Sequence, residues 1–270
     1  MIRRVCLHFA VAFVTAGAFA RELGAAPVHE AAGIGDVTEI RAQLLADAGA
    51  LESRDDLGRT PLIVAAQHGQ LAAVRLLLEK GAALEARDLN RRSPLTGGRT
   101  ALVFAVQAGK LEVVRLLLEK GAAIETRNRL GTTPLMYAAE QGQTEVAALL
   151  LEKGALIEAR DHNGATPLLL AAQQGQSGVA GLLLEKGAVI ETRNNFGSTP
   201  LALATDQGHL EVVKLLLEKG ANPNLEVQGR SPLRLAEERG RKDIAKLLRA
   251  AGALGQADGE SDPLRRLPGR

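Results

Sequence analysis

The chain has 270 residues, and 33 lysines and arginines stand against 31 aspartates and glutamates, which gives a formal net charge of +2. So small a positive excess excludes a surface built mainly to neutralise a nucleic-acid backbone. Hydrophobic residues make up 46% of the chain, but aromatic residues make up only 2% and tryptophan is absent. The apolar content is therefore mostly alanine, leucine and valine, which is typical of short, closely packed helices.

The first twenty residues have the pattern of a secretory signal peptide. The basic start "MIRR" precedes the uncharged apolar run "VCLHFAVAFVTAGAFA", which ends in a small-x-small triplet at Ala20. We expect cleavage after Ala20 and a periplasmic or secreted protein, and a retained membrane anchor is the alternative. Cleavage removes two arginines and no acidic residue, so the mature chain is formally neutral, and it also removes Cys6, the one cysteine. A chain without thiols suits an oxidising compartment.

A repeat dominates the rest of the chain. Thr-Pro or a close substitute recurs in register, and the spacings between the proline sites are 40, 33, 33, 33 and 32 residues. The six sites are Thr60-Pro61, Thr100-Ala101, Thr133-Pro134, Thr166-Pro167, Thr199-Pro200 and Ser231-Pro232. A period of 33 residues indicates a repeat architecture in which each unit packs against its neighbours.

Each unit has the same predicted elements, and the fifth unit, 161–193, shows them clearly. "DHNG" predicts a turn, after which Thr166 caps a helix and Pro167 occupies its first position. "LLLAAQQ" forms that short helix, which ends at Gly175. A second helix, "SGVAGLLLEK", ends at Gly187 and leads into an extended stretch. The pairs of alanines in the first helices allow close helix packing.

The stretch "GTTPLMYAAEQGQTEVAALLLEKGA", residues 131–155, resembles the repeat of ankyrin-repeat proteins over nearly its whole length. The resemblance covers Val28 to Leu254 and implies an all-α repeat solenoid of helix-turn-helix units joined by β-hairpin-like loops. We expect an ankyrin-repeat domain over 21–254 and a disordered tail over 255–270. The last unit carries Glu237 and Arg249 where other units are apolar, as a capping repeat requires. The seven predicted units are 27–54, 55–87, 88–127, 128–160, 161–193, 194–226 and 227–254.

No pattern in the chain predicts catalysis. His29 lies at the histidine of the family's T-P-L-H element, and His209 lies at its Gly-His element, so the resemblance gives both a structural role. His68 and His162 each stand alone. Cysteine and histidine do not cluster at metal-ligand spacing, and neither a phosphate-binding loop nor a Ser/His/Asp arrangement is present. We expect no catalytic residue, cofactor or metal, and a deep pocket at His68 or His162 would contradict that expectation.

Two charged columns repeat with the period. An acidic column and, two residues later, a basic column lie on one face of the extended stretch. Their side chains either form a Glu–Arg ladder that keeps the units in register or offer a charged strip to a partner. The columns are Glu52, Glu85, Glu125, Glu158 and Glu191, and Arg54, Arg87, Arg127, Arg160 and Arg193.

Positions that change from unit to unit are the better candidates for recognition, because the resemblance places binding at the hairpin tips and at the ends of the first helices. Phe196 is one of three aromatic residues outside the signal and is the one we expect to be exposed; Phe104 and Tyr137 fall inside first helices. Seven added residues, 91–97, lengthen one hairpin and either contact the partner or are a tolerated insertion. The predicted partner-binding residues are Asp56, Leu57, Arg59, Gln67, His68, Arg91, Arg92, Gln107, Arg129, Leu130, Thr132, Glu140, Gln141, His162, Asn163, Gln173, Gln174, Asn195, Phe196, Ser198, Asp206 and Gln207.

The sequence therefore predicts an exported bacterial protein that acts as a monomer and binds a partner protein through a concave face and its hairpin fingers, without enzymatic activity. Neither nucleic acid nor a membrane is an expected partner of the mature chain. An exported effector acting on a host or neighbouring-cell protein is one alternative. An enzyme or a small-ligand-binding protein is the second.

Overall fold

The computed structural model describes residues 27–89 and 97–254. Within these ranges the chain folds into α-helices in pairs, together with one short 3-10 helix, η1 (Ala48–Glu52). Loops connect the pairs, and an isolated antiparallel bridge between Val227 and Arg230 is the one β-type pairing in this part of the chain. The predicted signal peptide, the inserted Arg91-Arg92 and the predicted tail lie outside the described residues.

The helices confirm the predicted all-α repeat fold with its seven units. The first helices of the pairs are α2 (Pro27–Ile34), α4 (Pro61–His68), α6 (Ala101–Gln107), α8 (Pro134–Gln141), α10 (Pro167–Gln173), α12 (Pro200–Gln207) and α14 (Pro232–Glu238). The second helices are α3 (Val37–Ala46), α5 (Leu71–Glu79), α7 (Leu111–Glu119), α9 (Thr144–Glu152), α11 (Ser177–Glu185), α13 (Leu210–Glu218) and α15 (Lys242–Ala250).

The start and end of the first helices follow the predicted chemistry, with one exception. The Thr60 hydroxyl accepts a hydrogen bond from the N–H of Ile63, and Thr166 and Thr199 cap α10 and α12 in the same way. Gly69 ends α4 with a φ of 76°, in the left-handed region where a side chain is strained. Thr100 occupies the cap position of α6, but its hydroxyl makes no capping bond, so the expectation that threonine caps every unit is wrong there.

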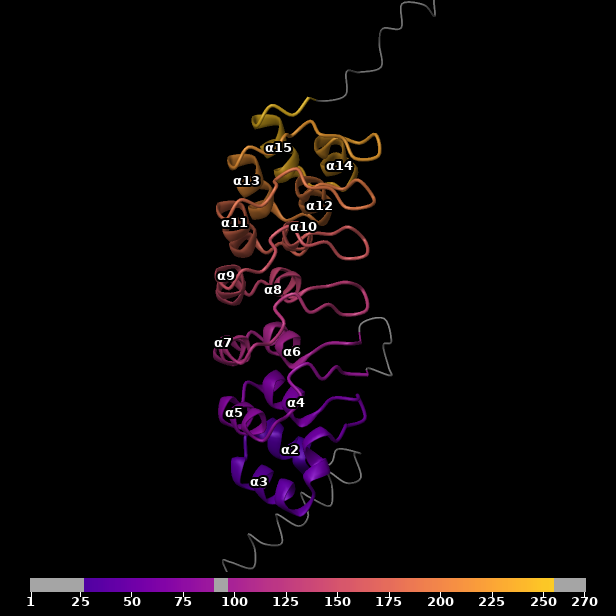
Figure 1. Ribbon diagram of the computed structural model, residues 1–270. Helices are drawn as coiled ribbons and strands as arrows, with labels where there is room; N and C mark the ends of the chain where they lie inside the picture. Colours follow the sequence, from indigo (N-terminus) through magenta and orange to yellow (C-terminus); the bar gives the residue numbers. More distant parts are fainter. Residues whose placement is uncertain (1–26, 90–96, 255–270) are drawn as a thin grey trace, which may run out of the picture. The chain divides into compact units, whose positions relative to one another are not determined.

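Contacts divide the chain into two compact units. The first contains residues up to 138 together with 143–162, and the second contains 139–142 together with the residues from 163 onward. In the first unit α2, α4 and α6 pack in one row, and α3, α5, α7 and α9 pack in another. In the second unit the rows are α10, α12 and α14, and α11, α13 and α15 (Figure 1).

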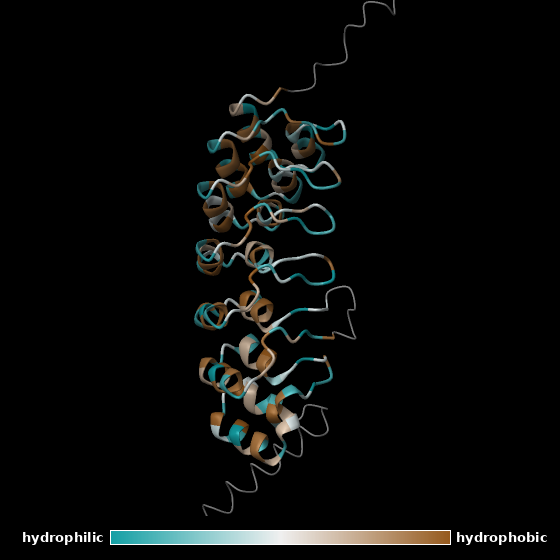
Figure 2. Ribbon diagram, viewed as in Figure 1, coloured by the Kyte–Doolittle hydropathy of each residue, from teal (hydrophilic) through white to brown (hydrophobic). Residues whose placement is uncertain are grey.

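Each unit has its core between the two rows of helices. The leucine of each "LLLEKG" phrase nearest the core is fully buried, as in Leu77 and Leu117 of the first unit and Leu216 of the second. Figure 2 shows the hydrophobic residues gathered on the helices and the hydrophilic ones along the loops. Phe104 and Tyr137 are buried within first helices, as predicted.

Candidate interaction surface

The loops that join one repeat to the next form fingers, whose described residues are 55–59, 88–89 with 97–99, 128–132, 161–165, 194–198 and 227–230. An aspartate or asparagine fixes the finger backbone. Asp55 Oδ1 accepts the N–H groups of Leu57 at 3.0 Å and of Arg59 at 2.8 Å. Asn128 and Asn194 hold their fingers in the same way. These three fingers are therefore ordered before any partner binds, which lowers the entropy cost of binding.

Backbone hydrogen bonds also connect consecutive fingers. In the first unit the N–H of His162 donates to the carbonyl of Leu130 at 3.0 Å. In the second unit the N–H of Asn195 donates to the carbonyl of Asn163 at 2.9 Å. The backbone groups of these predicted tip residues therefore bind the neighbouring finger. Their side chains, which differ between repeats, do not take part in these two bonds.

The acidic column connects successive repeats through the backbone. The Glu52 carboxylate accepts the N–H of Ala83 at 2.7 Å, and that of Glu85 accepts the N–H of Ala123 at 2.9 Å. Glu125 makes the same bond, and in the second unit Glu191 does so too. Each carboxylate satisfies an N–H group in the loop after the next pair of helices.

The basic column connects successive repeats through hydrogen bonds to backbone carbonyl groups. The Arg54 guanidinium donates to the carbonyls of Gly58 and Arg87, and the Arg87 guanidinium donates to those of Gly98 and Arg127 at 2.6 and 2.7 Å. The columns therefore keep the repeats in register, which agrees with the first of the two interpretations, a structural ladder. The predicted mechanism is corrected for these residues, because their bonds run to the neighbouring backbone and not between glutamate and arginine side chains.

A third column, not predicted as such, lies at the residue that precedes each second helix. Gln70 Nε2 donates to the carbonyl of Gly33 at 2.9 Å, and Gln176 Nε2 donates to that of Glu140 at 3.2 Å. His209 Nε2 makes the equivalent contact with the Gln173 carbonyl at 2.9 Å. These side chains satisfy carbonyls that the end of a first helix leaves without an intrahelical partner. The structural role implied for His209 is confirmed.

His29 is also structural. Its Nε2 lies 3.0 Å from the carbonyl oxygen of Arg59 in the next finger, and its side chain is buried. Burial lowers the pKa of His29, because the charged imidazolium is poorly solvated there.

Arginines at the base of three fingers bind the end of the following first helix. Arg59 pairs with Asp55 at 2.7 Å and donates to Gln67 Oε1 at 2.6 Å. The other two arginines contact residues in the same register, eight positions later. They are Arg99, which donates to Gln107 Oε1 at 3.2 Å, and Arg230, which pairs with Glu238 at 3.4 Å. Arg99 also pairs with buried Asp88 and lies 4.3 Å above the Phe104 ring. Three of the predicted residues, Arg59, Gln67 and Gln107, are thus already engaged within the chain.

Other predicted residues present their side chains to solvent. Phe196 is 61% exposed at the tip of its finger, as expected. The remaining predicted residues with exposed side chains are Asp56, His68, Arg129, Gln141, His162, Asn163, Gln173, Gln174, Asn195 and Gln207. Those that are half-buried are Leu57, Leu130, Thr132, Glu140, Ser198 and Asp206.

The two acidic helix ends in this set have different surroundings. Asp206 pairs with Arg239 of the next repeat at 2.7 Å. Glu140 is half-buried, and its carboxylate has neither a hydrogen bond nor an ion pair among the residues that the structure describes. Burial raises the pKa of Glu140, because nothing in its surroundings compensates for the lost hydration of the charge.

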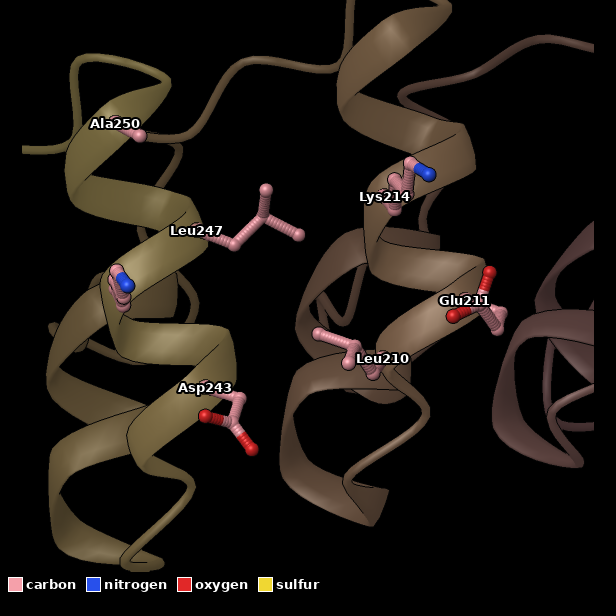
Figure 3. Close-up of a pocket in the computed structure, with 7 residues that line it drawn as sticks. Leu210, Glu211, Lys214, Asp243, Leu247 and Ala250 are labelled. Carbon is pink, nitrogen blue, oxygen red and sulfur yellow. The ribbon is translucent and has the colours of Figure 1, made fainter.

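A groove of about 460 Å³ lies between the second helices α13 and α15. Leu210 and Leu247 project toward the space between these helices (Figure 3). Neither His68 nor His162 lines this groove. The complete lining is Leu210, Glu211, Lys214, Asp243, Lys246, Leu247 and Ala250.

Two further searches concern the described part of the chain alone. Within residues 27–89 and 97–254, histidine, cysteine, aspartate and glutamate nowhere form a group of three or more that could hold a metal ion. Over the same ranges, each helix is too short or too polar to cross a membrane.

Helix pairs stacked in register, held by side chains that bind the neighbouring backbone and joined by fingers of variable sequence, define a repeat solenoid. The sequence profile described as "Ankyrin repeats (3 copies)" matches residues 7–88, 83–161, 102–194 and 168–257. The chain belongs to the ankyrin-repeat family. Repeats of this family are in general protein–protein interaction modules and are typically non-enzymatic.

Among solved structures, the crystal structure of the human ASB11 ankyrin repeat domain is similar to this chain. The two are 26% identical in sequence with a TM-score of 0.74, and the match covers 86% of this chain and 100% of the human domain. No curated protein matches the chain significantly.

Proposed function

We propose that this protein is a non-enzymatic interaction scaffold that binds one partner protein through its fingers and the ends of its first helices. We place it outside the bacterial cytoplasm, in the periplasm or beyond, after cleavage of the signal peptide behind Ala20. We take the mature chain to act as a monomer, because the last repeat that the structure describes carries polar residues on the side that no further repeat covers. Glu237 and Arg249, the polar replacements of the last repeat, pair with each other there.

The observation that carries this proposal is that repeating positions bind neighbouring repeats, whereas variable positions include exposed side chains. The repeating charged residues form hydrogen bonds with the backbone of the neighbouring repeat, as Glu85 and Arg87 do. The variable positions at the tips of the Asp55, Asn128 and Asn194 fingers lie on a backbone that is already fixed, and some of their side chains are exposed. Phe196 is the clearest case, because an apolar ring at a rigid tip gains most from burial by a partner. A fixed scaffold with variable exposed side chains suits selective binding of a protein.

Export rests on the sequence of the first twenty residues. A basic start, an uncharged apolar run and an A-x-A end are the pattern that a signal peptidase recognises. Loss of Cys6 with this segment leaves a mature chain that neither needs nor risks a disulfide.

The test is affinity capture of partners from a periplasmic extract with the mature chain, followed by mass spectrometry and a binding titration of the captured protein. In the decisive variant Phe196, Arg91 and Arg92 are all replaced by alanine. We expect affinity for the captured protein to fall about tenfold or more, while the melting temperature stays nearly unchanged, since these positions are variable and Phe196 is exposed.

Leu156→Ala is the matched control. Leu156 is also an exposed apolar residue, at 58%, but it lies in the loop after α9 and away from the fingers. Its replacement is expected to leave affinity unchanged. Equal affinities of the triple variant and the unmodified chain would contradict the proposed surface, and an uncleaved N-terminus on the exported protein would contradict the proposed processing.

A further inference from the structure

The chain contains its own example of how the end of a first helix is recognised. In three repeats a finger arginine donates to the side chain eight positions later, as Arg59 does to Gln67 and Arg99 does to Gln107. Arg230 and Glu238 repeat the relation with a carboxylate as acceptor. A guanidinium group is thus the natural partner of an acceptor at this register, because it is planar and offers several N–H donors at once.

This arginine is missing from three consecutive repeats. Thr132, Ala165 and Ser198 occupy the register of Arg59, and none of them can reach the helix end as an arginine does. The corresponding helix ends are Glu140, Gln173 and Asp206. The chain therefore keeps the acceptors in its central repeats but not the donors.

In the second unit these three helix ends form one row. Gln176 binds the carbonyl of Glu140 and His209 binds that of Gln173, so each residue's helix end is held by the repeat that follows it. Arg241 continues the series at the carbonyl of Gln207, beside Asp206. The row thus runs from Glu140 through Gln173 to Asp206.

The three side chains of this row differ in whether they already have a partner within the chain. Asp206 is already paired with Arg239. The Gln173 carboxamide is exposed, and the half-buried Glu140 carboxylate has no partner in the part of the chain that the structure describes. A carboxylate that has lost part of its hydration without gaining a cation is unfavourable in the free protein. An incoming cation at Glu140 relieves that cost, which makes the site selective for a positively charged group.

We propose that Glu140 is a recognition site for an arginine side chain of the partner protein, with the Gln173 carboxamide as a second acceptor one repeat farther along. The inference rests on the proposed function, since it names the chemistry of the partner at that same surface. Arginine is favoured over lysine because its planar fork can donate two parallel hydrogen bonds to one carboxylate.

The first experiment uses N-acetyl-arginine methylamide as the probe and the NMR signal of the ¹³C-labelled Glu140 carboxyl as the readout. We expect a saturable shift with the arginine compound and none with the matching citrulline compound, which has nearly the same shape but no charge. The side-chain amide signal of Gln173 is the second readout, and Glu140→Gln is expected to abolish its response to the arginine compound. Glu238→Gln is the matched control, because Glu238 is already paired with the chain's own Arg230 and Arg234, and it is expected to leave the response intact. An arginine response equal to the citrulline response overturns the proposal.

The second experiment supplies the missing arginine within the chain, by Thr132→Arg. Position 132 lies eight residues before Glu140, the register of Arg59 and Gln67, so the added charge is expected to lower the pKa of the Glu140 carboxyl and abolish binding of the arginine probe. Thr132→Gln, which adds length without charge, is expected to do neither. If the arginine variant leaves the Glu140 pKa and the probe response unchanged, the proposed site is wrong even if the free probe binds elsewhere.

The captured partner separates the two proposals. Loss of partner binding in the triple finger variant, with unchanged binding in Glu140→Gln and Thr132→Arg, supports the interaction surface and overturns the arginine site. Weaker partner binding by tenfold or more in both Glu140→Gln and Thr132→Arg supports the site. Probe binding at Glu140 without any captured partner supports the site and contradicts the proposed function.

Discussion

Single charged side chains contribute hydrogen bonds that join one repeat to the next. Glu85 reaches a backbone N–H group two helices later in the chain, and Arg87 reaches a carbonyl at the same level. Such bonds cross the boundary between repeats and add to the apolar packing of the helices. A charge that would be a weak surface feature in isolation thereby becomes part of the stacking interaction.

Removal of one of these bonds tests this role at the scale of the residue. Glu85→Ala is expected to lower the free energy of unfolding by about 1 kcal/mol, because the N–H of Ala123 loses its acceptor. Glu85→Gln keeps an acceptor oxygen and is expected to lose less. Urea unfolding followed by circular dichroism measures both values.

Glu112→Ala is the control for that measurement. Glu112 is 68% exposed on α7 and makes only a 3.9 Å contact with Arg115, so its replacement is expected to change stability by less than about 0.5 kcal/mol. Equal losses for Glu85→Ala and Glu112→Ala would contradict a role of the acidic column in stacking.

At the scale of the element, the first helices have seven or eight residues and a similar start signal, but they do not share the same cap. The Thr166 hydroxyl accepts the N–H of Leu169 at 3.4 Å at the start of α10. The Thr100 hydroxyl at the start of α6 is buried and has no hydrogen-bond partner among the described residues. The same residue type in the same register thus has different energetic consequences in two repeats.

Threonine-to-alanine substitutions measure that difference. Thr166→Ala is expected to cost about 1 kcal/mol of stability through loss of the cap. Thr100→Ala is expected to be within about 0.5 kcal/mol of neutral, because it removes a buried hydroxyl that makes no bond. Chemical denaturation of the two variants side by side is the measurement, and a larger loss for Thr100→Ala would show that its hydroxyl does bond in solution.

At the scale of the whole molecule, stability depends on each repeat covering the apolar face of its neighbour. In the second unit Leu201 and Leu216 belong to one buried cluster with Leu233 and Leu248 of the last repeat. The last repeat closes this cluster, and its own polar residues Glu237 and Arg249 are exposed to solvent.

Two truncations distinguish the last repeat from the predicted tail. Deletion of 227–270 is expected to lower the melting temperature by roughly 5 °C or more, since Leu201 and Leu216 lose apolar neighbours. Deletion of 255–270 alone is expected to leave the melting temperature unchanged. Differential scanning calorimetry provides the comparison, and a similar loss in both truncations would assign a stabilising role to the tail.

The sequence by itself determined the repeat, the helices and most of their boundaries, because these depend on local signals. The period of Thr-Pro, the glycines at helix ends and the apolar spacing of "LLLEK" all act within one unit, so they can be found without knowing what the unit packs against. The same holds for the buried Phe104 and Tyr137 and for the exposed Phe196, whose places follow from their register in the repeat.

Only the tertiary structure decided what the charged and amide side chains contact. Glu85 and Ala123 lie 38 positions apart, and Arg87 reaches a carbonyl 40 positions away, so the sequence showed two columns but not that they bind backbone groups. The arginine that reaches the helix end eight residues later was equally hidden. Both relations depend on how stacking directs a side chain. For the same reason the sequence did not distinguish Glu140 from the other variable residues. The structure shows that its carboxylate is half-buried and lacks the arginine that other repeats supply.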